Sequence, residues 1–221
     1  MAIAPALQLV IFDCDGVLVD SEHLAVEVEV GILGDLGWDL APEEIVDRFL
    51  GLSDADYQSQ IEDHLGRLLP PGWLADMTPR YREAFDRELA PVKGVEEAIE
   101  ALEAAGLSTC VASSGDHEKI RHNLDLTGLY ERFAGRIYSA TEVELGKPAP
   151  DLFLRAASQM GVPAKRCAVV EDSPAGLAGA LSAGMAAIAF SSGLVPRARL
   201  ELPGVIVIEE MAELASLVID A

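Results

Sequence analysis

From about Val92 onward, short apolar runs alternate with stretches of helical periodicity. Strands that alternate with helices indicate βαβ units and therefore a mostly parallel sheet. An earlier apolar run, Leu9-Val10-Ile11-Phe12, has the same character and adds a strand near the N-terminus. The other predicted strands are residues 107–112, 135–138, 167–170, 185–190 and 205–208. The sequence therefore predicts an α/β fold.

The segment between the first strand and the rest of the sheet has a helical pattern. Within residues 22–89, apolar residues recur every four positions, at Leu24, Val28, Ile32 and Leu36. This spacing predicts a helix with one apolar face. Residues 91–94 would carry the chain back to the sheet. We therefore expect a Rossmann-like α/β core of residues 1–20 and 91–221, with a helical domain of residues 21–90 inserted after the first strand.

Four of the apolar runs end in polar or glycine-rich groups. If the strands are parallel, these groups lie at the edge where open α/β sheets bind their ligands. That edge would then hold acids, a hydroxyl, backbone N–H groups and a lysine. The four groups are Asp13-Cys14-Asp15-Gly16, Ser113-Ser114-Gly115, Gly146-Lys147-Pro148 and Glu171-Asp172-Ser173.

These residue types suit phosphoryl transfer. An aspartate can attack phosphorus and form an aspartyl-phosphate. Because carboxylate and phosphate repel each other, the site needs positive charge, which Lys147 and a divalent cation would supply. Mg²⁺ prefers oxygen ligands, and we expect Asp13 and Asp172 to hold it. Asp15 is the nearest candidate for the acid and base that a leaving group and a water require.

A glycine-containing turn after the second strand is the predicted phosphate-binding element. Ser113 and the N–H groups of Ser114 and Gly115 can hold phosphoryl oxygens at the start of a helix, together with Lys147. The alternative for Ser113 is a helix cap. Glu171 has two open interpretations, as an acid that supports the site or as an indirect metal ligand.

The four groups, taken in their order along the chain, resemble the motifs of the haloacid dehalogenase (HAD) superfamily. The resemblance implies that Asp13 is the nucleophile and that Asp15 is the acid/base, with its backbone carbonyl on Mg²⁺. It implies that Ser113 and Lys147 bind the phosphoryl group and that Asp172 ligates the metal. The helical insertion resembles the cap domain of the β-phosphoglucomutase-like subfamily.

Departures from several HAD members narrow the expected reaction to phosphatase chemistry. Dehalogenases lack the second aspartate, here Asp15, and phosphonatases use a cap lysine, whereas residues 22–92 contain none. Phosphoglucomutases carry a cap arginine where this chain has Gly51-Leu52-Ser53-Asp54, and a histidine near Ala25. We expect hydrolysis of a small phosphorylated metabolite, a sugar phosphate or phospho-acid, through an aspartyl-phosphate. A phosphomutase and a non-enzymatic metal-binding scaffold are the alternatives.

The composition narrows the expected partners and location. A net charge of −21 disfavours nucleic acid as a partner, since the phosphate backbone would be repelled. The apolar runs are shorter than the roughly 18 residues of a membrane span, and no secretory signal is evident. Three cysteines, an odd number, favour reduced thiols. We expect a cytoplasmic monomer or weak dimer.

Overall fold

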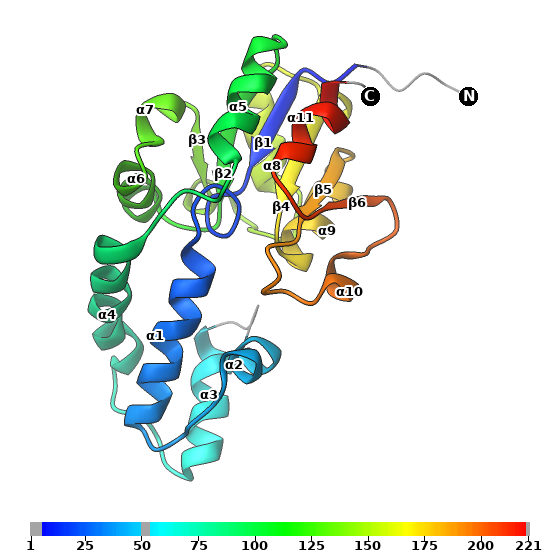
Figure 1. Ribbon diagram of the computed structural model, residues 1–221. Coiled ribbons are helices and arrows are strands. Elements are labelled where there is room, and N and C mark those ends of the chain that lie inside the picture. The colour runs from blue at the N-terminus through cyan, green and yellow to red at the C-terminus, as the bar shows by residue number, and fades with distance from the viewer. Residues whose placement is uncertain (1–5, 50–53, 220–221) are drawn as a thin grey trace. The chain divides into compact units, whose positions relative to one another are not determined.

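The computed structural model describes residues 6–49 and 54–219. Its contacts divide the chain into two compact units, Met1–Asp20 with Ala90–Ala221, and Ser21–Leu89. The first unit combines strands and helices, and the second is helical (Figure 1). Assignment of the second unit as a cap domain stays a prediction.

The described part of the first unit contains a six-stranded sheet in the order β3-β2-β1-β4-β5-β6, and neighbouring strands are parallel. This confirms the predicted α/β fold with its mostly parallel sheet. The strands are β1 (Leu9–Phe12), β2 (Ser108–Ser113), β3 (Ile137–Ser139), β4 (Cys167–Glu171), β5 (Ala186–Phe190) and β6 (Val205–Ile208).

The strand order places a topological switch point at β1. The chain moves from β1 outward to β2 and β3, then crosses back to β4 on the other side of β1. Ligands of open α/β sheets bind outside the carboxyl ends of the strands at such a point. The segments that follow β1, β2 and β4 are therefore the ones the fold makes available for a site.

Helices cover both faces of this sheet. Helix α5 packs against α11 on one face, and α8 packs against α9 on the other (Figure 1). All four residues of β1 are fully buried, which explains why the strand is a continuous apolar run instead of an alternating one. The helices are α5 (Val95–Ala104), α6 (His117–Leu126), α7 (Tyr130–Phe133), α8 (Asp151–Gln159), α9 (Pro174–Ser182), α10 (Arg197–Leu200) and α11 (Ala212–Ile219), with 3₁₀ turns η1 (Ala140–Glu142) and η2 (Ala164–Arg166).

The helical unit consists, in its described part, of α1 (Ser21–Asp35), α2 (Pro42–Phe49), α3 (Asp54–Leu65) and α4 (Trp73–Glu88). The predicted apolar face of α1 is partly wrong. Of its four members only Ile32 is buried, and the other apolar buried positions are Val26 and Leu33. The reason is that α1 packs against both α2 and α4, so that more than one face of the helix is covered.

Two expectations from composition can be compared with the structure. All three cysteines are buried free thiols, as expected. Among the described residues, no helix combines the length and apolarity that a bilayer crossing requires.

Glu29 in α1 gives the helical unit a predicted pH dependence. Burial raises the pKa of Glu29 from 4.5 to about 7, Glu22 adds to the rise, and the hydrogen bond from the Tyr81 hydroxyl opposes it. A raised folded-state pKa favours folding below the unfolded pKa, and this contribution is lost as the pH rises through about 7. Glu29→Gln should therefore raise the free energy of unfolding by about 1–2 kcal/mol at pH 8.5, after a discount for partial exposure, and by much less at pH 5.

Denaturant unfolding at the two pH values measures this difference. Glu27→Gln is the matched control, because Glu27 lies on the same helix with an exposed side chain. An equal effect of Glu29→Gln at both pH values would show that its carboxyl group does not experience the burial described here.

Candidate active site

Strand register brings the polar groups after β1, β2 and β4 to one edge of the sheet. Phe12 at the end of β1 is level with Val111 of β2 and Val170 of β4. Asp13 then continues the ladder, with its backbone N–H donating to the Val170 carbonyl at 3.0 Å. Ser113 ends β2, and Asp172 directly follows β4. Segments more than a hundred positions apart therefore meet at the switch point.

A tight turn after β1 directs the chain away from the sheet edge. Gly16 has a φ of 76°, a backbone conformation that side chains rarely adopt, and its N–H donates to the Val19 carbonyl at 2.9 Å. The turn begins directly after Asp15, so the chain leaves the sheet edge just beyond the second aspartate.

Lys147 lies between two buried carboxylates. Its Nζ is 2.5 Å from Asp13 Oδ1 and 2.6 Å from Glu171 Oε1, and its side chain is 6% exposed. The chain segment after β3 thus brings a cation to Asp13, the aspartate that directly follows β1. The ring of Phe153, 5.3 Å from Nζ, adds a cation–π contact.

In this group of residues, the pKa values of both Asp13 and Lys147 lie above their usual values. Burial raises the pKa of Asp13 from 3.8 to about 7, with Lys147 opposing the rise and Glu171 adding to it. Burial alone would lower the pKa of Lys147, but the charges of Asp13 and Glu171 outweigh it and hold the pKa above its usual value. Lys147 is therefore protonated throughout the physiological range, and an additional cation would favour the charged form of Asp13.

Three buried carboxylates form a group that fits a divalent cation. Ligand atoms of Asp13, Glu171 and Asp172 lie within 4.8 Å of one another. Lys147 pairs with two of them, Asp13 and Glu171, and Lys119 pairs with the nearby Asp15. Oxygen donors in this number suit Mg²⁺, which keeps several waters when bound.

Both carboxylate oxygens of Glu171 are engaged by neighbouring protein groups. Its Oε2 accepts from the Ser173 N–H at 2.9 Å and the Ser173 hydroxyl at 2.8 Å, and its Oε1 pairs with Lys147. These contacts favour Glu171 as a residue that orients Lys147. Gly176 in α9 makes room for it, because a Cβ there would lie 1.8 Å from Glu171 Oε1.

Gly176→Ala is expected to lower both stability and activity. The added methyl group must displace the Glu171 carboxylate from Lys147, because the methyl group and the carboxylate cannot occupy the same space. Overpacking of this kind costs about 1–3 kcal/mol in the free energy of unfolding. We expect kcat to fall about tenfold or more through misplacement of Lys147, measured by steady-state kinetics beside thermal unfolding.

Gly31→Ala is the matched control for this substitution. Gly31 is also helical, but a Cβ there meets nothing within 4 Å. Removal of a helical glycine should stabilise the protein by about 0.5–1 kcal/mol and leave kcat unchanged. If Gly176→Ala behaved like Gly31→Ala, the close packing of Glu171 against α9 would be disproved.

Ser113, Ser114 and Gly115, the residues predicted to bind the phosphoryl group, lie at the end of β2 and in the turn before α6. Ser113 is 1% exposed, and its Oγ accepts from the Gly115 N–H at 3.1 Å, while Ser114 is exposed. Asp116 caps α6 by accepting from the Lys119 N–H at 2.8 Å. The Ser139 hydroxyl donates to the Gly115 carbonyl at 2.6 Å, which fixes the turn against β3.

The Asp15 carboxylate accepts hydrogen bonds from two side chains of α6. Its Oδ2 accepts from Lys119 Nζ at 2.7 Å, and its Oδ1 from Asn123 Nδ2 at 3.1 Å. Sequence reasoning did not single out Lys119 or Asn123. A signal was present, because Ile120 and Leu124 are apolar residues four positions apart, and Asn123 is a polar residue on the same helical stripe, three positions after Ile120.

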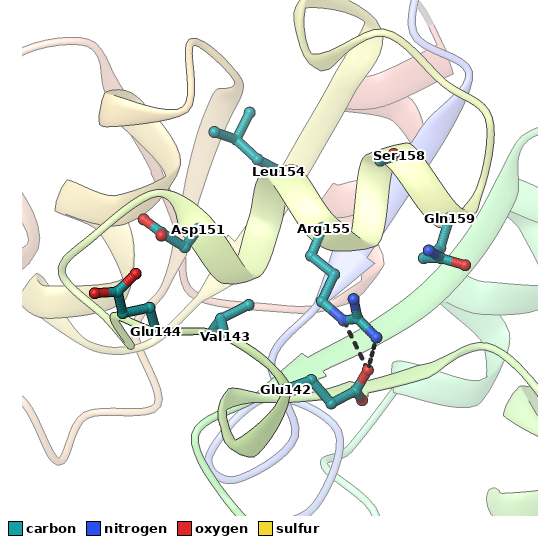
Figure 2. Close-up of a pocket in the computed structure, with 8 residues that line it drawn as sticks. All are labelled: Glu142, Val143, Glu144, Asp151, Leu154, Arg155, Ser158 and Gln159. Atoms are coloured by element: carbon teal, nitrogen blue, oxygen red, sulfur yellow. Dashed lines mark hydrogen bonds and ion pairs between the residues drawn. The ribbon is translucent and has the colours of Figure 1, made fainter.

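A pocket of about 410 Å³ lies outside this group of residues, beside α8 (Figure 2). Its lining includes Glu142, Glu144, Asp151 and Arg155 and none of the predicted site residues. Glu142 accepts from Arg155 and is 2.7 Å from His117 Nε2, so it ties α8 to the start of α6. The acidic lining would repel a phosphate, and the pocket is not the predicted site.

The chain is similar in sequence and fold to known proteins. The sequence pattern of the haloacid dehalogenase-like hydrolases matches residues 7–184. A 6-phosphogluconate phosphatase of Escherichia coli is 31% identical over 186 residues, which cover 83% of this chain and 82% of that protein. The chain belongs to the haloacid dehalogenase-like hydrolases. The predicted family membership and hydrolase class are therefore confirmed, and the non-enzymatic scaffold is set aside.

Two solved structures of HAD proteins match nearly the whole hydrolase. A haloacid dehalogenase-like protein of unknown function from Agrobacterium tumefaciens is 34% identical with a TM-score of 0.88, and the match covers 96% of this chain and 98% of that one. A HAD family hydrolase from Deinococcus radiodurans, with bound phosphate and sodium, is 30% identical with a TM-score of 0.85 over 99% and 97% of the two chains.

Proposed function

We propose that this hydrolase is a Mg²⁺-dependent phosphatase that cleaves a small phosphorylated metabolite through an aspartyl-phosphate on Asp13. The observation that carries the proposal is the buried contact of Asp13 with Lys147, 2.5 Å apart, within a group of carboxylates at the switch point of the sheet. A nucleophilic carboxylate needs such a cation, because it must approach a negatively charged phosphoryl group. The phosphate bound to the Deinococcus relative supports the same ligand class.

The proposed reaction assigns a residue to each step. A carboxylate oxygen of Asp13 attacks phosphorus while the bond to the leaving oxygen breaks, and Asp15 gives that oxygen a proton. A water then attacks phosphorus, Asp15 takes its proton, and the bond between phosphorus and Asp13 breaks. Lys147 and the turn of Ser113, Ser114 and Gly115 hold the phosphoryl oxygens during both steps.

Asp13 and Asp172, with the backbone carbonyl of Asp15, would hold the metal ion. When bound, Mg²⁺ would neutralise charge between the nucleophile and the phosphoryl oxygens. Glu171 would serve by orienting Lys147, given its contacts with Ser173 and Lys147. This assignment follows the donor types and their burial.

The test is phosphate release from p-nitrophenyl phosphate with Mg²⁺, after EDTA, and after Mg²⁺ is restored. We expect turnover to be abolished by the chelator and recovered with the metal. Turnover that is indifferent to EDTA would contradict the metal assignment, and no turnover by folded protein with Mg²⁺ would contradict the phosphatase. A screen of sugar phosphates and phospho-acids, beginning with 6-phosphogluconate because of the Escherichia coli relative, would then identify the substrate.

The phosphomutase alternative has weaker support. A mutase would carry its cap arginine in the stretch that corresponds to residues 51–54. Residues 51–53 and the side chain of Asp54 lie outside the described residues. The sequence shows an acid and no arginine in this stretch, and an acid would repel the second phosphate of a mutase substrate. Formation of glucose 6-phosphate from β-glucose 1-phosphate would overturn this preference.

A further inference from the structure

Both carboxylate oxygens of Asp15 are bound by side chains from a single helix. Lys119 Nζ is 2.7 Å from Oδ2 and Asn123 Nδ2 is 3.1 Å from Oδ1. Residues four positions apart lie on the same face of a helix, so α6 presents the two donors together. The side chain of Asp15 is 16% exposed, and α6 fixes the orientation of its carboxylate.

Burial of the Asn123 amide costs desolvation free energy, which indicates that its contact with Asp15 serves a function. The residue is 1% exposed, and Ile120, three positions before it, and the adjacent Leu124 are buried as well. Its Oδ1 has no hydrogen-bond partner among the described residues. An apolar side chain of similar size would avoid this desolvation, so packing alone does not explain an amide here.

The same helix also carries the turn predicted to bind the phosphoryl group. Gly115 donates to Ser113 Oγ, and Asp116 caps the helix through the Lys119 N–H. The turn and the two donors to Asp15 therefore move as one element. A phosphoryl group held at the turn and the carboxylate of Asp15 would keep a constant separation.

We propose that Lys119 and Asn123 are positioning residues, which hold the Asp15 carboxylate where it exchanges a proton with the leaving oxygen and then with the attacking water. The inference rests on the proposed phosphatase function. Neither residue needs to touch the reacting atoms. The competing role for Lys119 is direct binding of the phosphoryl group, which predicts a different dependence on the substrate.

The test compares two aryl phosphates with the variant Lys119→Met. Phenolate is a poor leaving group and needs a proton, whereas p-nitrophenolate leaves without one. We expect kcat/KM for phenyl phosphate to fall on the order of 10²-fold. For p-nitrophenyl phosphate, kcat/KM should fall only about tenfold. The loss on phenyl phosphate should lie in kcat with KM little changed, and Lys119→Arg should restore part of it.

Two further variants keep the test decisive. Arg121→Met is the matched control, because it removes a cation from the same helix whose ion pair is with Asp125, and it should leave both substrates unaffected. Asn123→Leu should give the same selective loss on phenyl phosphate while the melting temperature stays equal or rises. This variant also serves if Lys119→Met does not fold.

The outcomes separate the inference from the function on which it rests. An equal loss of kcat/KM on both substrates, a loss confined to KM, or full activity of both variants would overturn the positioning role while the phosphatase stands. Wild-type protein that fails to turn over either substrate with Mg²⁺ would contradict the proposed function, and this inference with it.

Discussion

Asp13→Asn is expected to lower kcat on p-nitrophenyl phosphate by a factor on the order of 10³ or more. An amide cannot form the aspartyl-phosphate, and Asp13 is the carboxylate at the end of β1 that lies against Lys147. The fold should persist, because Lys147 keeps its contact with Glu171 at 2.6 Å. Steady-state kinetics together with circular dichroism measure both effects.

The control for this variant is Asp125→Asn, which neutralises a surface carboxylate of α6 paired with Arg121. It should retain full activity. Retention of the wild-type rate by Asp13→Asn would disprove its role as the nucleophile. A loss of both activity and structure would instead indicate that Asp13 is needed to balance the charge of Lys147.

Lys147→Met carries the second large expected effect. The substitution leaves Asp13 and Glu171 buried without the cation between them, and loss of one partner from a buried ion pair costs about 3–5 kcal/mol. Activity of the folded fraction should fall by about 10²- to 10³-fold, the loss seen when a donor to a developing charge is removed. Denaturant unfolding and initial rates on the same preparation measure the two effects.

Lys165→Met is the matched control, since Lys165 is exposed in η2. It should change neither quantity. An unfolding free energy for Lys147→Met close to that of the wild type would contradict the buried ion pair. Loss of stability with full activity would remove Lys147 from the proposed mechanism and leave it a structural role only.

The sheet and the gathering of polar groups at its carboxyl edge were predictable because they follow from local pattern. Apolar runs flanked by helical stretches identify parallel strands, and polar groups directly after β1, β2 and β4 fall at the same edge in such a sheet. The structure brings Asp13, Lys147 and Asp172 to this edge.

The contacts of Asp15 and Glu171 were not predictable, for reasons that lie in long-range packing. Asp15 meets Lys119 and Asn123 across 104 and 108 positions of sequence, and no local pattern encodes such a pairing. The space that Gly176 leaves for Glu171 depends on how α9 meets β4. A helical glycine read from sequence alone indicates only lowered helix propensity.

The buried face of α1 shows the same limit. A recurrence every four residues predicts one apolar face, but α1 packs against two other helices, and Val26 and Leu33 are buried as well as Ile32. Periodicity identifies the helix correctly. Which faces are covered depends on its neighbours.

Trapping of the phosphorylated enzyme tests the central claim most directly. The hydrolase is mixed with p-nitrophenyl phosphate and Mg²⁺, quenched rapidly in acid and reduced with borohydride, which converts an aspartyl-phosphate to homoserine. We expect peptide mass spectrometry to find homoserine at position 13, and to find none when Mg²⁺ is omitted. Turnover without this product, or with the modification on another residue, would contradict the account.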